Sequence, residues 1–109
     1  MPYDEGLAQR IREAFEERSD ISEKRMFGGI VFLLHGNMCC GVVRSELMVR
    51  VGPDGYDDAL TQPHAREMDF TGKPMRGMIY LSAEGIEADA DLEQWLARGV
   101  AFSSALPAK

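Results

Sequence analysis

The chain has 109 residues, of which 45% are hydrophobic and 28% charged, and its formal net charge is −6. This is the composition of an ordinary globular protein, long enough for one hydrophobic core and too short for two, so we expect residues 1–109 to form a single domain. The net negative charge repels a polyanion, which argues against a protein that binds DNA directly.

The N-terminal residues predict a helix and no export signal. In residues 4–18 apolar side chains recur at the spacing of one helix face: Leu7, Ile11, Ala14 and Phe15. Residues 19–23 are predicted to be a polar linker. The first residues lack the basic start and apolar stretch of a secretory signal, and no segment approaches the about 20 apolar residues of a membrane span. We therefore expect a cytoplasmic protein that makes no contact with a membrane.

Residues 25–52 are predicted to form four short antiparallel strands. Gly28-Gly29 and Gly36-Asn37 are the dipeptides of two-residue hairpin turns, and residues 44–46 would form a three-residue loop. Counting alternate residues outward from these turns defines a core face. Its predicted members are Phe27, Ile30, Phe32, Leu34, Cys39, Gly41, Val43, Leu47, Val49 and Val51.

The opposite face of this sheet is predicted to be too apolar to remain in water. We take five of its side chains as interface candidates: Met26, Met38, Met48, Leu33 and Val42. The same alternation also places His35, Cys40 and Arg50 there. Methionines form adaptable contact surfaces, and either residues 64–81 fold over this face or a second subunit covers it in a homodimer.

The remaining chain completes a two-layer fold. Residues 54–60 are predicted to be a short helix, residues 67–70 and 78–81 are predicted strands, and a long amphipathic helix begins at Asp89, with fraying expected from Ser103 onward. The fold class is therefore α+β. We expect a two-layer α/β sandwich, with an N-terminal and a C-terminal helix packed on an antiparallel sheet of five to six strands.

Four segments together resemble a known family. They are residues 25–29 (RMFGG), 47–53 (LMVRVGP), 63–64 (PH) and 68–77 (MDFTGKPMRG). In this order they resemble the TfoX/Sxy N-terminal domain family. The resemblance implies a two-layer α/β domain with an antiparallel sheet. In two-domain members it also implies regulation of natural-competence genes, alongside the cyclic-AMP receptor protein.

The chain resembles the stand-alone members, since no C-terminal helical domain follows. The resemblance thus implies a non-enzymatic regulatory or binding module that contacts a protein partner. A transcription factor such as the cyclic-AMP receptor protein is the expected kind of partner. The alternative is a small-molecule or anion-binding protein, with weak catalytic activity around Arg50, His64 and Arg76.

Positive charge is concentrated in the segments that carry the resemblance. Residues 24–76 hold seven basic and six acidic side chains, whereas the rest of the chain holds five and twelve. Guanidinium groups there could converge on an anion or a partner, or they could form structural ion pairs, Arg50 and Arg76 with Asp69 and Glu67. The candidates for the anion or partner site are Arg25, Arg50, His64, Arg66, Asp69, Lys73 and Arg76.

Other chemistry is not predicted. His35 and Cys40 are two potential zinc ligands, whereas a zinc site normally takes at least three protein groups, and His64 is a further donor only if the fold brings it near. We therefore expect no metal and no cofactor. Cys39 and Cys40 are neighbours that a regular strand would point to opposite faces, which argues against a disulfide. The serines show no nucleophile motif, and we expect no catalytic residue.

Overall fold

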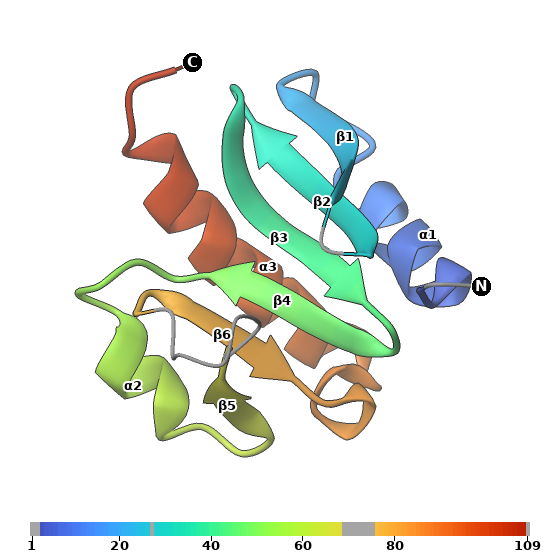
Figure 1. The fold of residues 1–109 in the computed structure, drawn as a ribbon. Helices are drawn as coiled ribbons and strands as arrows, with labels where there is room; N and C mark the ends of the chain where they lie inside the picture. The colour runs from blue at the N-terminus through green and yellow to red at the C-terminus, as the bar shows by residue number, and fades with distance from the viewer. Residues whose placement is uncertain (1–2, 27, 69–75, 109) are drawn as a thin grey trace.

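A six-stranded antiparallel sheet forms one layer of the protein. The computed structural model describes residues 3–26, 28–68 and 76–108. The strands are β1 (Ile21–Met26), β2 (Gly29–Leu34), β3 (Asn37–Val43), β4 (Glu46–Arg50), β5 (Ala65–Glu67) and β6 (Met78–Leu81). They lie in the order β1-β2-β3-β4-β6-β5, and every pair is antiparallel (Figure 1).

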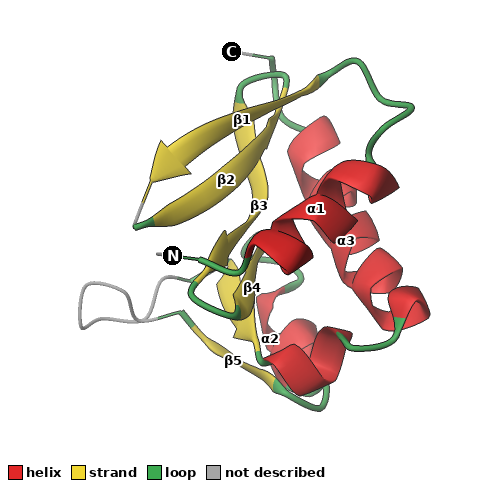
Figure 2. Ribbon diagram, turned by 90° about the vertical axis from the view of Figure 1, so that its right-hand side faces the viewer, coloured by secondary structure: helices red, strands yellow, loops and turns green. Residues whose placement is uncertain are grey.

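The helices lie on one face of this sheet (Figure 2). They are α1 (Glu5–Ala14), α2 (Tyr56–Leu60), α3 (Asp89–Ser104) and a 3-10 turn, η1 (Ala83–Ile86). Asp4 caps α1 by accepting a hydrogen bond from the backbone N–H of Leu7 at 3.1 Å. Among the described helices, none is both long enough and apolar enough to cross a bilayer. The predicted α+β sandwich, with a helix from each end of the chain on an antiparallel sheet, is confirmed.

The main core lies between the helices and the sheet. Leu7 and Ile11 of α1 and Leu92 and Leu96 of α3 are buried against strand residues that alternate along the chain. The buried strand residues include Ile30, Phe32, Leu34, Leu47, Val49, Ile79 and Leu81. The period-2 pattern of the strands and the helical spacing of α1 and α3 thus place their apolar side chains in one core.

Both predicted hairpin registers are wrong by one residue. Met26 pairs with Gly29, and Leu34 pairs with Asn37, so His35 and Gly36 form the second turn. His35 has a φ of 50° and Gly36 a φ of 83°. Histidine thus occupies the first left-handed position, which the prediction assigned to glycine because glycine adopts it without strain. The loop after β3 is also one residue shorter than predicted, since Val43 pairs with Glu46.

A β-bulge corrects the face assigned to Val42. Phe32 pairs with Cys40 and Leu33 with Met38, so Cys39 is an extra residue in β3. An extra residue reverses the alternation beyond it. Cys40 and Val42 therefore lie in the helix-covered core, each 0% exposed, whereas Val43 belongs to the opposite face. Val42 is thus not part of the predicted interface.

Three element boundaries also differ from the prediction. Ile21 begins β1, although residues 19–23 were predicted to be a linker, because pairing with Leu34 of β2 orders a largely polar strand. The fifth strand is Ala65–Glu67, two residues earlier than predicted. Helix α3 continues to Ser104, and the buried Ser103 hydroxyl donates to the carbonyl oxygen of Met38 at 2.9 Å, which holds the predicted frayed end in place.

Candidate functional site

The sheet face away from the helices carries a second apolar cluster. Its buried members are Val31, Val43, Met48, Met68, Met78 and Tyr80, and three partly exposed side chains pack against them: Met26, Leu33 and Met38. We call these three side chains the methionine patch. They come from β1, β2 and β3, and register places Lys24 of β1 directly opposite Val31 on the same face.

Much of this second cluster is buried within the single chain. Val31, Met48 and Met68 are each 0% exposed. Met68 follows β5 directly and lies in the segment of residues 64–81 that was predicted as one possible cover. Met48 therefore offers no surface to a partner, and among the described apolar side chains of this cluster those of the methionine patch remain available for contact.

The Arg66 side chain of β5 reaches across β6 to β4 at the other end of this face. Both terminal guanidinium nitrogens donate to the Glu46 carboxylate, one of them at 2.8 Å to Oε1, and the guanidinium lies 4.8 Å from the centre of the Tyr80 ring. This two-point geometry is that of a structural ion pair that ties β5 to β4.

Arg50 and Arg76 are held by two further aromatic rings. Arg50 lies over Phe102 of α3 at 5.1 Å, and Arg76 lies over Tyr56 of α2 at 5.3 Å. Arg76 also lies 3.5 Å from the carboxylate of Asp57, and not against Glu67 as predicted for a structural ion pair. Among the described residues, therefore, the guanidinium groups are distributed over separate rings and carboxylates.

The other predicted binding residues are also dispersed. Arg25 is exposed on β1, the edge strand, and His64 is exposed between α2 and β5 with a φ of 68°. Asp69 and Lys73 lie outside the described residues. The structure thus does not bring Arg25, His64 and Arg66 together around one anion.

The two cysteines share the helix-covered face because of the bulge. Hydrogen bonding between the thiols lowers the pKa of Cys39 and raises the pKa of Cys40, which burial raises further. Both side chains are 0% exposed and both are free thiols. His35 lies in the hairpin turn, 3.6 Å from Asp20, and no metal-binding group of three or more His, Cys, Asp or Glu side chains occurs within residues 3–26, 28–68 and 76–108.

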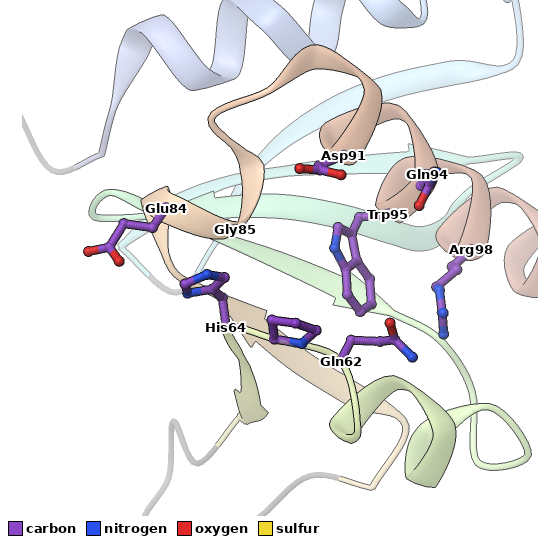
Figure 3. A pocket seen from close by; sticks show the side chains of 9 residues that line it. Gln62, His64, Glu84, Gly85, Asp91, Gln94, Trp95 and Arg98 are labelled. Atoms are coloured by element: carbon purple, nitrogen blue, oxygen red, sulfur yellow. The ribbon is translucent and has the colours of Figure 1, made fainter.

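One pocket was not predicted from the sequence. It has a volume of about 300 Å³ and lies between the residues after α2, the turn η1 and the first half of α3 (Figure 3). Trp95 and His64 are among its lining residues. Its walls combine residues 62–64 with residues that lie 20 or more positions later, which no local pattern could have joined, although the run of acidic residues before Trp95 was visible in the sequence.

The family comparison matches the strands and most of the helices just described. The model of the TfoX N-terminal domain matches residues 13–103. The chain belongs to the TfoX N-terminal domain family. Neither the curated proteins nor the solved structures contain a match to the chain.

Two of the TfoX N-terminal domain segments meet in the structure. Gly52 and Gly77 have φ angles of 82° and 96°, and the Gly77 carbonyl oxygen accepts hydrogen bonds from the N–H groups of Val51 and Gly52 at 2.8 and 3.1 Å. A side chain at Gly77 would lie 3.2 Å from the carbonyl carbon of Gly52. These two glycines therefore let the chain just after β4 lie close beside the chain just before β6, next to the pair of Arg50 and Met78.

Proposed function

We propose that this TfoX N-terminal domain is a non-enzymatic regulatory module that binds another protein through the methionine patch. The observation that carries the proposal is the patch itself. Met26, Leu33 and Met38 keep exposed apolar surface on a sheet face that the described helices do not cover. Flexible thioether side chains suit a surface that must adapt to a partner.

Charge supports a protein partner over DNA. The net charge of −6 disfavours a polyanion, whereas Lys24, beside the patch, has no ion pair within the described part of the chain. A complementary partner surface would present apolar side chains and a carboxylate. For a member of this family we propose a transcription regulator such as the cyclic-AMP receptor protein, with the control of competence genes as the process.

A second copy of the chain is the other occupant that the patch could take. An isologous dimer would bury Met26, Leu33 and Met38 of both subunits. Light scattering over a range of concentrations separates the two cases, because a dimer through this patch has twice the monomer mass and Met38→Gln restores the monomer mass.

The proposal is tested by binding of purified cyclic-AMP receptor protein and RNA polymerase to the immobilised domain. Two variants change the patch, Met38→Gln and Lys24→Glu. Two matched controls make the same kinds of change elsewhere: Leu106→Gln, at a partly buried leucine after α3, and Arg76→Glu, whose side chain is 61% exposed beside α2.

Loss of binding in the two patch variants alone would support the proposed surface. Equal binding by all four variants would refute the patch as the contact surface, and loss in Arg76→Glu alone would move the contact to the arginines. If neither protein binds the unaltered domain, the proposed partners are wrong.

A further inference from the structure

The pocket beside Trp95 lies on the helix-covered side of the sheet, apart from the methionine patch. Its side chains come from the residues after α2, from η1 and from α3, as Figure 3 shows. A volume of about 300 Å³ is that of a small-molecule site. Three features of the pocket indicate its ligand: the contact that builds its wall, the unpaired indole N–H of Trp95 at its floor, and its charge.

The wall of the pocket is built from a close contact between His64 and Gly85. A Cβ atom at Gly85 would lie 2.7 Å from the Cβ of His64, so only glycine lets η1 approach the imidazole this closely. His64 itself has a φ of 68°, a strained conformation for a residue with a side chain, and its carbonyl oxygen accepts from the N–H of Ser82 at 3.3 Å. A backbone strain of about 1 kcal/mol persists only where the surrounding structure enforces it. Such strained residues are often found at binding sites.

Trp95 forms the floor and leaves one donor without an acceptor. Its side chain is only 7% exposed, and its indole N–H makes no hydrogen bond to the described part of the chain. In Figure 3 the nitrogen edge of the indole is turned to the side of the pocket where His64 lies. The Tyr56 hydroxyl is the buried polar atom without a partner among the described residues, so the indole N–H is not enclosed by protein and remains open to the pocket. An oxygen atom of a ligand at this position would accept a hydrogen bond from it.

The electrostatic character of the pocket is negative. Residues 82–97 contain five acidic side chains and no Lys or Arg. Two of these acids, Glu84 and Asp91, line the pocket and form no ion pair within the described residues. Arg98 at the other end is neutralised by Asp58 at 3.1 Å, and its guanidinium lies 4.7 Å from the centre of the Trp95 ring. That stacking shows that the indole already attracts a cation.

We propose that this pocket binds a small protonated amine that also carries hydrogen-bonding oxygens, the chemistry of an amino sugar or an amino alcohol. The ammonium group lies against the carboxylate of Asp91. A hydroxyl or carbonyl oxygen of the ligand accepts from the indole N–H of Trp95. The amides of Gln62 and Gln94, which also line the pocket, supply both donors and acceptors for further hydroxyl groups.

The experiment uses the single tryptophan of the chain as its reporter. Three probes of nearly equal shape are titrated at a pH where the amine is protonated: glucosamine, glucose and glucuronate. The readouts are the Trp95 fluorescence and its indole N–H resonance, both of which arise from the pocket alone. We expect glucosamine to bind up to about fivefold more tightly than glucose, the largest ratio that one exposed ion pair supplies, and glucuronate to bind more weakly than glucose.

Variants locate the binding and test its charge. Asp91→Asn should weaken glucosamine binding by up to about fivefold and remove its preference over glucose. Glu93→Gln is the matched control on α3, because Glu93 is exposed and does not line this pocket, and it should leave glucosamine binding unchanged. Arg98→Gln removes a like charge and should not weaken glucosamine. Circular dichroism verifies that each variant is folded.

Three results would overturn the proposal. Equal affinity for glucose and glucosamine would show that the pocket does not recognise the amine. Tighter binding of glucuronate would show that the pocket prefers a negatively charged ligand. The absence of any change in the indole resonance with all three sugars would show that the pocket does not take this class of ligand. None of these results affects the methionine patch, because this inference does not depend on the proposed regulatory function.

Discussion

Removal of one hydroxyl group should stabilise the protein. The Tyr56 side chain is 5% exposed, and its hydroxyl is the buried side-chain polar atom without a hydrogen-bond partner in the described part of the chain. Leaving such a group unsatisfied costs about 1–3 kcal/mol. Tyr56→Phe removes the hydroxyl but keeps the ring beneath the Arg76 guanidinium, at 5.3 Å. We expect the free energy of unfolding to rise by about 1 kcal/mol and Tm by about 4 °C.

The pH dependence of the same variant gives an independent check. Burial raises the pKa of Tyr56 above its ordinary value, so the folded state favours the protonated phenol. The stability from this preference is fully present below about pH 10 and is lost as the pH rises through the raised pKa. The unaltered protein should therefore lose stability over the alkaline range more steeply than Tyr56→Phe.

Urea denaturation at neutral and alkaline pH, followed by circular dichroism, measures both effects. A lower free energy of unfolding for Tyr56→Phe at neutral pH would refute the reasoning, because it would show that the hydroxyl has a stabilising partner. Parallel alkaline curves for the two proteins would refute the claim about its ionisation.

Four further substitutions test the packing of the sheet. Gly99→Ala should lower stability by about 1–3 kcal/mol in thermal unfolding, because its new methyl would lie 2.8 Å from the Cys39 carbonyl oxygen; a gain, as at an exposed helical glycine, would contradict that contact. Met48→Ala should cost about 2–5 kcal/mol and Met38→Ala under about 1, since only Met48 is fully buried; equal costs in urea denaturation would mean that the second face is covered differently. Ser103→Ala should cost about 1 kcal/mol by calorimetry, because it leaves the Met38 carbonyl oxygen without its donor; no change would show that the end of α3 is loosely held.

The fold was predictable because its signals are periodic. The spacing of Leu7 and Ile11 predicts a helix with one buried face, and the alternation of Ile30, Phe32 and Leu34 predicts a half-buried strand. Each signal is repeated over several residues, so an error of one residue at a turn did not change the class of the fold.

The faces of β3 could not be predicted because they depend on single residues. His35 adopts the left-handed turn position that favours glycine, and Cys39 is an extra residue that pairs with nothing opposite. The register error at the turn leaves Met38 and Cys39 on their predicted faces. The bulge at Cys39 then reverses the alternation, so Val42 was assigned to the wrong face. A bulge has no compositional signal in this sequence.

The partners of the candidate arginine side chains could not be predicted from the sequence because these side chains are long. An arginine reaches several possible partners, and sequence does not show which aromatic ring it lies against. Phe102 and Tyr80 hold Arg50 and Arg66, from elements 52 and 14 positions away in the chain. The choice between one convergent site and separate ion pairs therefore required side-chain positions, and Arg50, Arg66 and Arg76 lie against separate rings and carboxylates.

The place of α3 in the chain has a consequence for the order of folding during synthesis. Strands β2, β3 and β4 are complete by residue 50, whereas Leu92, Trp95 and Leu96 of α3, which share a core with these strands, are translated more than 40 residues later. Until these residues leave the ribosome, core side chains such as Phe32 and Leu47 lack the part of their packing that α3 supplies and are open to chaperones or to wrong contacts. The nascent protein therefore cannot gain its full stability strand by strand, and its core closes only once α3 has been synthesised.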